Sequence, residues 1–345
     1  MSSLALRRGT VLSVDRPGPA AELTVDVAGE RRRALSFEGT TGAAEAGDDV
    51  VLNVAAVDLA LGSGGFDIVH VNLTRGLGGA GEPGAHVMKL NYTSLQHAVH
   101  PVEEEAESRG QRAEGELPFV SGRPVAVIAL HAQLPCVAWA AAQARPGARV
   151  GYVQTAGGAL PGAMSRVVRE MLESGLLAGH VTAAPAFGGS HEAITVAGGL
   201  HAGLTALGWH AAIAGPGPGI LGSATALGHG GLAALDNAHA ALALGATAIV
   251  VPRMSSGDAR PRHRGLSHHT RTVLGLMLAP ALVALPEGVD QPLPGEHEAR
   301  FGAADLAGYR GSGLPVRTMG RGPDEDDLFF RASLAGGSVL AGEIR

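Results

Sequence analysis

Histidine, arginine and glycine concentrate in three short segments in the second half of the chain. These segments run from Gly188 to Glu192, from Gly215 to Gly231 and from Arg260 to His269. Imidazole rings transfer protons or bind metals near neutral pH, and guanidinium groups bind phosphates and carboxylates. Backbone N–H groups of glycines at a helix start also bind anions. The three segments therefore hold the residue types of a site for an anion.

Two kinds of role follow for the individual side chains. The candidate catalytic residues are His191, Glu192 and His263, as groups that transfer a proton or orient the group that does. The candidate anion-binding residues are Gly188, Gly189, Ser190, Gly217, Gly219, Gly222, Arg260, Arg262 and Arg264. Further candidates are Lys89, Thr155, His229, His268, His269 and Arg321. Adjacent helical residues point about 100° apart, so His191 and Glu192 are unsuited to binding one metal together.

Each of these features also has a purely structural interpretation. Gly217–Gly222 fits G-x-G-x-x-G, but it does not follow the first strand of the predicted sheet, and a tight strand-to-helix turn explains it equally well. Ser190 is a good helix N-cap. The Arg260–Arg264 segment is either an anion site or a solvated loop or subunit contact, and its density of cations in a chain of net charge −6 favours the anion site. Lys89 is the only lysine, and we expect it to be functional or buried against a carboxylate.

The hydrophobic pattern changes along the chain. In the first part, short segments rich in β-branched residues predict strands at 9–15, 21–27, 33–37, 49–57 and 67–73. From residue 124, apolar runs alternate with helical periodicity and predict strands at 125–130, 149–154, 180–184, 210–214, 246–251 and 281–285. The expected fold is α/β, with a mostly parallel, doubly wound, Rossmann-like sheet and a small N-terminal all-β, barrel-like domain.

We expect four parts along the chain. They are a β domain (1–75), a connector with an extended segment at 86–93 and an acidic stretch (76–123), the Rossmann-like domain (124–286) and a tail that packs on the body (287–345). Doubly wound sheets bind ligands beyond the carboxyl ends of their strands. The three segments follow predicted strands, as do His131 and Arg253, so we expect them to meet at one edge of the sheet.

Composition excludes several classes of protein. One cysteine, Cys136, rules out a disulfide framework, and we expect it to be buried in the core. Without a closed set of cysteine and histidine ligands, we expect no structural zinc and assign no metal ligand. The acidic net charge argues against nucleic acid as a partner. The sequence shows neither a signal peptide nor an apolar run long enough for a bilayer, so we expect a cytoplasmic protein with no membrane partner.

Several stretches carry a family resemblance. They are 86–93 (HVMKLNYT), 188–192, 217–230, 260–270 and 314–322 (LPVRTMGRG). Through them the chain closely resembles a bacterial family known only as domain of unknown function number thirty-eight sixty-six, over nearly its whole length. The resemblance implies no activity.

Two functions fit these observations. In the first, the protein is an enzyme that acts on a small metabolite bearing phosphate or carboxylate, with the reaction class undetermined. In the second, the same loops bind a metabolite without catalysis, and the N-terminal domain contacts a partner. The cofactor stays unknown, and a homo-oligomer is compatible with the sequence.

Overall fold

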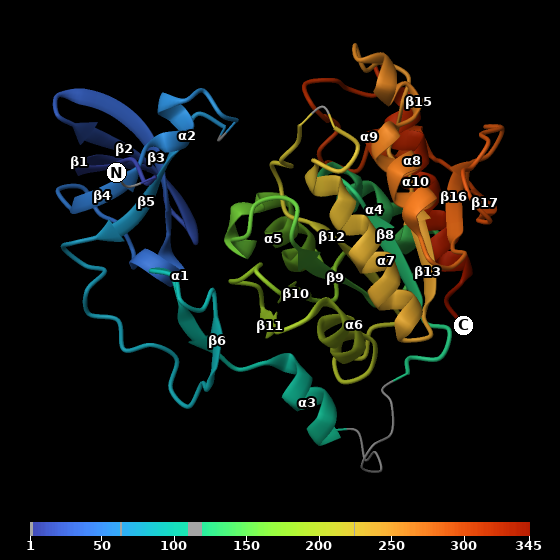
Figure 1. The fold of residues 1–345 in the computed structure, drawn as a ribbon, viewed down its shortest axis with the longest axis horizontal. Coiled ribbons are helices and arrows are strands. Elements are labelled where there is room, and N and C mark those ends of the chain that lie inside the picture. The colour runs from blue at the N-terminus through green and yellow to red at the C-terminus, as the bar shows by residue number, and fades with distance from the viewer. Residues whose placement is uncertain (1–2, 63, 110–118, 224) are drawn as a thin grey trace. The chain divides into compact units, whose positions relative to one another are not determined.

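The computed structural model describes residues 3–62, 64–109, 119–223 and 225–345 (Figure 1). It consists of two compact units, residues 1–99 and 100–345. Within the described residues, no helix combines the length and the apolar character that crossing a membrane requires.

The N-terminal unit is built on a closed five-stranded barrel. Its strands are β1 (Leu6–Arg16), β2 (Ala20–Val27), β3 (Glu30–Phe37), β4 (Asp49–Asn53) and β5 (Asp67–Asn72). They follow the order β1-β2-β3-β5-β4, with β3 parallel to β5 and the other pairs antiparallel, which is the connectivity of an OB-type barrel. Alternate residues of β2, such as Leu23 and Val25, fill the core because side chains of a strand alternate between its two faces.

Two short helices and one hairpin lie between the barrel strands or follow them. Helices α1 (Glu38–Thr41) and α2 (Ala55–Asp58) are single turns. Strands β6 (Val87–Lys89) and β7 (His97–Val99) pair antiparallel as a separate hairpin. Four of the predicted strands coincide with barrel strands to within three residues at each end, and the extended segment predicted at 86–93 contains β6. The predicted strand 49–57 is too long, because β4 ends at Asn53 and residues 55–58 form α2.

The C-terminal unit contains an all-parallel sheet of eight strands, which confirms the predicted α/β fold. These are β8 (Pro124–Ile128), β9 (Val150–Thr155), β10 (His180–Ala183), β11 (His191–Ala193), β12 (Ala211–Pro216), β13 (Thr247–Val251), β16 (Leu282–Pro286) and β17 (Glu298–Gly302). Their order in the sheet is β11-β10-β9-β12-β8-β13-β16-β17. A second, two-stranded sheet pairs β14 (Met254–Ser255) with β15 (Gly265–Leu266).

Helices cover both faces of the sheet, as a parallel sheet requires. They are α3 (Val102–Arg109), α4 (Leu134–Ala144), α5 (Arg166–Glu173), α6 (Val196–Leu204), α7 (Ala233–Ala243), α8 (His268–Leu276), α9 (Leu306–Arg310) and α10 (Asp327–Gly342). Residues of α4, α5 and α10 pack with Ala126 and Ile128 of β8 on one face. Residues of α3, α6, α7 and α8 pack with Val125 and Val127 on the other. The two faces of β8 thus bury separate hydrophobic clusters.

The C-terminal residues are more deeply integrated than a tail on the surface. Strand β17 extends the sheet beyond β16, and α10 packs against α4 and β16. In this region the sequence predicts two helical pieces, Asp305–Tyr309 and Glu325–Ala332. The first agrees with α9, whereas the second covers only the first part of α10, which continues through Gly336 and Gly337. Here the two glycines are packing positions, because a Cβ on Gly337 would lie 2.2 Å from the Val137 carbonyl oxygen.

Glycines also bring two loops at the carboxyl edge of the sheet into direct backbone contact. A Cβ on Gly230 would lie 1.9 Å from the Gly157 carbonyl oxygen, and one on Gly158 would lie 2.1 Å from the Gly217 carbonyl oxygen. The loop after β9 and the loop after β12 therefore pack together in a way that only glycine permits.

Candidate functional site

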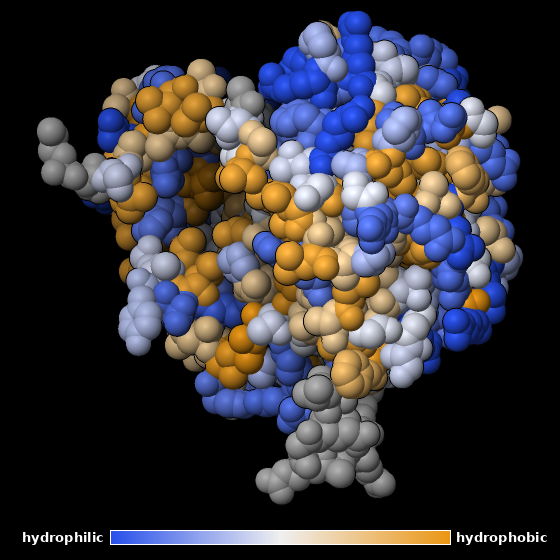
Figure 2. All heavy atoms as spheres, turned by 45° about the vertical axis from the view of Figure 1, so that its right-hand side comes forward, coloured by the Kyte–Doolittle hydropathy of each residue, from blue (hydrophilic) through white to orange (hydrophobic). Residues whose placement is uncertain are grey.

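A cavity of about 720 Å³ lies beyond the carboxyl ends of β12, β8 and β13, which are neighbours in the sheet. Its walls come from four chain segments and two helices. The lining residues are Leu130, His131, Ala132 and Pro135 after β8, 218–223 after β12, Arg253, Arg260, Arg262 and His263 after β13, Pro315, Arg317, Thr318 and Met319 before α10, Val167 of α5 and His269 of α8. The end of this unit that carries β15 in Figure 1 is mainly hydrophilic in Figure 2. The cavity therefore occupies the position where doubly wound sheets bind ligands.

The cavity lining is cationic. Among the described residues that line it are the guanidinium groups of Arg253, Arg260, Arg262 and Arg317, three histidines and no aspartate or glutamate. Arg253 is buried, whereas the other three arginines are exposed. This charge pattern contrasts with the net charge of −6 of the whole chain.

One buried carboxylate behind the lining holds several of these cations. Asp258 is 1% exposed and accepts hydrogen bonds from Nε and Nη2 of Arg260 at 2.9 Å each, and from Nη2 of Arg253 and of Arg321 at 3.3 and 3.4 Å. Burial opposes ionisation of Asp258, but the hydrogen bonds from Arg260 outweigh it, so the pKa of Asp258 is lowered. Burial lowers the pKa of Arg253 to about 10.

The predicted arginines therefore differ in their availability. Arg262 forms no hydrogen bond or ion pair with the rest of the described chain and lines the cavity. Arg264 donates from Nε to the Asp258 carbonyl oxygen and is absent from the lining. Arg321 is committed to Asp326, with Nε 2.9 Å from Oδ2, and to Asp258. Arg262 is thus the predicted arginine best placed to contact a ligand.

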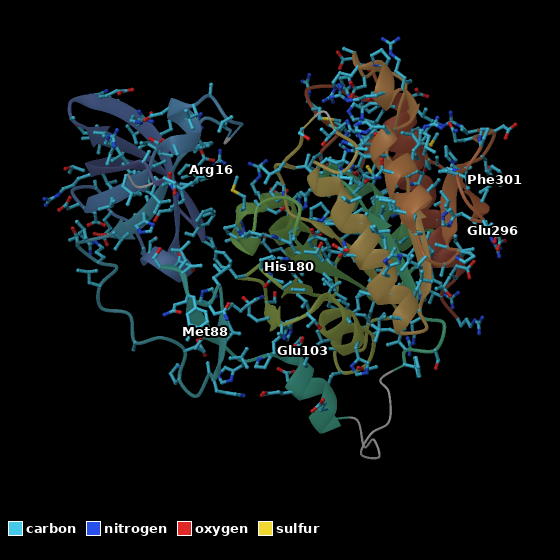
Figure 3. All side chains as sticks on the ribbon, in the orientation of Figure 1. Arg16, Met88, Glu103, His180, Glu296 and Phe301 are labelled. Atoms are coloured by element: carbon cyan, nitrogen blue, oxygen red, sulfur yellow. The ribbon has the colours of Figure 1, made fainter. Side chains whose placement is uncertain are left out.

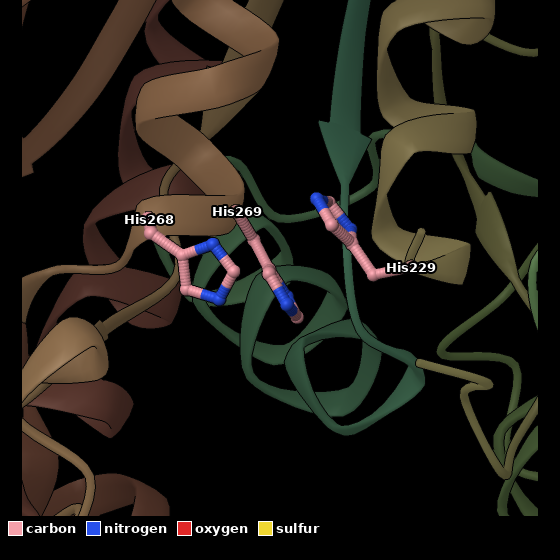
Figure 4. Close-up of side chains that lie close together, drawn as sticks. All are labelled: His229, His268 and His269. Atoms are coloured by element: carbon pink, nitrogen blue, oxygen red, sulfur yellow. The ribbon is translucent and has the colours of Figure 1, made fainter. Parts of the chain in front are cut away.

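Four imidazole rings gather beside the cavity. Ser267 is the N-cap of α8, and its side chain accepts from the His269 N–H, so His268 and His269 occupy the first turn. The ring of His229, from the loop before α7, stacks on His269 with centroids 3.7 Å apart (Figure 4). The ring centroid of His263 lies 4.7 Å from that of His268 and 4.9 Å from that of His269.

These histidines are neutral near pH 7. Burial, and then the charge of Arg253, lowers the pKa of His263 to about 4. Burial lowers the pKa of His269 to about 2, with His229 and Arg253 adding to the effect. The pKa values of His229 and His268 are also lowered, mainly by burial. A neutral imidazole carries one lone pair on its ring, so the cluster offers lone pairs rather than positive charge.

Another histidine of the cavity wall, His131, is held by two hydrogen-bond partners. Nε2 of His131, on the cavity wall, is 2.8 Å from the Ser165 hydroxyl, and Nδ1 is 3.2 Å from the Pro216 carbonyl oxygen. The carbonyl only accepts, so Nδ1 carries the proton and Nε2 accepts from Ser165. Ser165 is 3% exposed and is the N-cap of α5, so its hydroxyl is held within the protein. Burial lowers the pKa of His131 to about 4.

The segment Gly188–Glu192 lies at the other end of the sheet. His191 and Glu192 belong to the edge strand β11 and not, as expected, to the first turn of a helix, because the N-cap of α6 is Thr195 and not Ser190. Glu192 accepts from the Thr182 hydroxyl and from the Gly188 N–H. The N–H groups of Ile194 and Thr195 donate to Glu103 of α3, which Figure 3 labels. None of the residues 188–192 lines the cavity.

The remaining predicted residues divide between the cavity and the core. Gly219 and Gly222 line the cavity, whereas Gly217 packs against the loop after β9, with a Cβ position 2.3 Å from the Ala159 carbonyl oxygen. Thr155 is buried, and its hydroxyl accepts from Asn237. Lys89 is buried in β6, and Cys136 is buried in α4, where burial raises the pKa of its thiol to about 12.

Five of the described polar residues in the cavity lining were not predicted as site residues: His131, Ser223, Arg253, Arg317 and Thr318. His131 and Arg253 directly follow β8 and β13, and this position at a strand end was the only signal they gave. Arg317 lies in the segment 314–322, which carries the family resemblance, but Arg321 was the residue of this segment that was predicted for the site.

Comparisons with known proteins add the family but no activity. Neither the curated proteins nor the solved structures contain a match to the chain. The family described as "Protein of unknown function (DUF3866)" matches residues 33–337, from β3 into α10. The match covers most of both units, and so the chain belongs to this family of unknown function.

Proposed function

We propose that this protein binds an anionic small molecule, bearing a phosphate or carboxylate group, in the cavity beyond β12, β8 and β13. The observation that carries the proposal is the lining of the cavity, in which four arginines and three histidines occur without an acidic side chain among the described residues. Asp258 pairs with Arg253 and Arg260, but Arg262 and Arg317 form no ion pair with the described residues, so the lining favours a bound anion.

The ligand is expected to be an organic anion and not a bare inorganic ion. The volume of about 720 Å³ lies within the range of about 300–1,000 Å³ that is usual for small-molecule sites. The lining also includes apolar side chains, namely Leu130, Pro135, Val167 and Ile220. A molecule with an apolar body and an anionic group would suit a cavity lined by both these side chains and the arginines.

The three kinds of cation would act differently on such a ligand. Arg262 and Arg317 are exposed, so they would attract the anion and contact it at the surface, where salt screens them. Arg253 is buried with its Nε unpaired among the described residues, so a hydrogen bond to a ligand there would be shielded from solvent. Arg260 contributes less, because Asp258 already binds its guanidinium group.

Arg262 and Arg264 provide a matched test, since both are exposed arginines of one turn and only Arg262 lines the cavity. Isothermal titration calorimetry would measure binding of inorganic phosphate, phenyl phosphate and benzoate to Arg262→Ala, Arg264→Ala and unaltered protein. We expect Arg262→Ala to weaken binding of phenyl phosphate about tenfold at low salt, or about 1.4 kcal/mol, and less at high salt. Arg264→Ala should bind like the unaltered protein, and phenyl phosphate should bind more tightly than inorganic phosphate.

Equal weakening by the two substitutions, or no binding of any of the three probes, would count against the cavity as an anion site. Mass spectrometry of molecules that copurify with the protein would identify the natural ligand independently of these probes. A cationic or purely apolar molecule at one equivalent per chain would contradict the proposal.

A second candidate function, catalysis on the bound anion, is favoured by one observation. His263 lines the cavity as a neutral imidazole whose Nδ1 is 2.8 Å from the Ser267 hydroxyl, so its ring is held in place. A positioned neutral imidazole is a candidate general base. If the copurifying molecule is converted by the protein, and His263→Asn retains binding but loses conversion, then the cavity is an active site with His263 as its base.

A further inference from the structure

The histidine cluster beside the cavity has more lone pairs than partners. His229 and His269 are buried, and His268 is partly buried. Nδ1 and Nε2 of His229 and Nε2 of His268 are all buried without a hydrogen-bond partner among the described residues. Leaving one such group unsatisfied typically costs about 1–3 kcal/mol. A neutral imidazole has one N–H and one lone pair, so His229 has a buried lone pair without a partner among the described residues, and a metal ion is a ligand that would accept it.

One ring nitrogen from each of His229, His268 and His269 lies within 4.8 Å of the other two. We propose that these three histidines bind a divalent transition-metal ion. Imidazole is a usual ligand of zinc, copper, nickel and iron, whereas magnesium and calcium take oxygen ligands, which this trio does not supply. The proposal does not depend on the proposed function, because it rests on the histidines alone.

The hydrogen bond between Arg253 and His269 shows which nitrogen of the His269 ring is unprotonated. Nη1 of Arg253 lies 3.1 Å from Nδ1 of His269, and a guanidinium group only donates. Nδ1 of His269 therefore carries a lone pair. A metal bound there would replace Arg253, which keeps its ion pair with Asp258 at 3.3 Å.

The Nδ1 atoms of His229 and His269 lie near the same point beside Gly231. A Cβ on Gly231 would lie 3.3 Å from Nδ1 of His229 and 3.5 Å from Nδ1 of His269, so both nitrogens border the same space. In a tetrahedral zinc site with Zn–N bonds of about 2.05 Å, ligand nitrogens are roughly 3.4 Å apart. From the upper separation of 4.8 Å, the ligand nitrogens would therefore have to approach one another by up to about 1.4 Å on binding.

Three histidines leave a coordination position open, as in catalytic zinc sites. His269 lines the cavity, so this position would be reached from the cavity. The site contains no carboxylate and lies next to Arg253, so a divalent ion there would need an anionic ligand in the open position. The sequence predicted no structural zinc and assigned no metal ligand, so the proposed metal site goes beyond those predictions. The sequence did not predict this group of three ligands, because His229 lies far along the chain from His268 and His269.

Cobalt(II) is the probe for the test, because its visible absorption reports ligand number and geometry. The full chain would be stripped with a chelator and titrated with Co²⁺, with zinc competition to obtain affinities. We expect one equivalent per chain, and a loss of affinity of more than about a hundredfold in His229→Asn and in His268→Asn, since removing even an outer partner of a metal ligand costs about 10–100-fold. His70→Asn, a histidine of the barrel strand β5, is the matched control and should bind like the unaltered protein.

Gly231→Ala keeps every ligand and tests the site if the histidine variants fail to fold. Gly231 lacks a positive φ, so alanine suits its backbone, but the new methyl group would occupy the space beside the two Nδ1 atoms. We expect this variant to lose affinity for Co²⁺ while its circular dichroism stays unchanged. The proposal is overturned if the stripped protein binds no Co²⁺, or if His229→Asn, His268→Asn and Gly231→Ala all bind it with unaltered affinity. Loss of cobalt binding without loss of phenyl phosphate binding would separate this site from the anion site.

Discussion

Acid should destabilise the C-terminal unit through histidines that are buried as neutral rings. His180 of β10 is the clearest case (Figure 3), because it is 3% exposed and stacks on Tyr152 with centroids 5.3 Å apart. Its Nε2 lies 3.1 Å from Oε1 of the Gln154 side chain. Burial, followed by the proximity of His131, lowers the pKa of His180 to about 3.

The sign and size of the effect follow from linkage. In the unfolded chain a histidine has a pKa of about 6.5, so between pH 6.5 and the folded pKa the unfolded state binds a proton that the folded state does not. Above about pH 6.5, His180 therefore does not change the stability. As the pH falls from 6.5 toward the folded pKa of about 3, the free energy of unfolding decreases. At pH 5, about 1.5 units below the pKa of histidine in the unfolded chain, protonation of the unfolded state lowers the free energy of unfolding by about 2 kcal/mol relative to pH 7.

Urea unfolding at pH 7 and pH 5, followed by tryptophan fluorescence, measures this difference. Trp139 and Trp209 are the two tryptophans and both lie in the C-terminal unit, so the signal reports this unit. His180→Gln should lose about 2 kcal/mol less than the unaltered protein between the two pH values, whatever its stability at pH 7. An equal loss in the two proteins, or an NMR titration of His180 with a pKa near 6.5, would refute the reasoning.

Two further substitutions test the packing of the same unit by urea unfolding at pH 7. Asp258→Asn should lower the free energy of unfolding by about 3–5 kcal/mol, because it leaves the buried guanidinium group of Arg253 without its counter-ion, and a loss below about 1 kcal/mol would contradict this. Gly151→Ala should destabilise by about 1–3 kcal/mol or more and shift the fluorescence of Trp209, since the added Cβ would lie 2.1 Å from the indole ring; an unchanged emission spectrum would argue against this close contact.

Most strands could be predicted from the local sequence, because a buried strand needs apolar residues within the strand itself. β8, buried on both faces, reads as the continuous apolar run Pro124–Ile128. β17 was not predicted, because it is an edge strand in which only Gly302 is buried. α10 was predicted too short, because Gly336 and Gly337 are favoured there by contacts with β13 and α4 that only the tertiary structure contains.

The order of strands in the sheet decided which predicted site residues meet. Sequence reasoning assumed that strands consecutive in the chain would bring their loops together, but β10 and β11 lie at one end of the sheet, with β9 and β12 between them and β8. His191 and Glu192 are therefore separated from His263, which follows β13. The loops after β12 and β13 do meet, and they bring His229 beside His269. No periodicity in the sequence encodes this order.

The glycine contacts between the loops after β9 and β12 determine how a ligand would enter. Because Gly157 lies against Gly230 and Gly158 against Gly217, these parts of the loops are held in one arrangement before any ligand arrives. A molecule that binds beside them would not have to order this backbone, a step that otherwise costs roughly 1–2 kcal/mol for each residue fixed. Association would then need no rearrangement of these parts of the two loops, which removes one step that could slow binding.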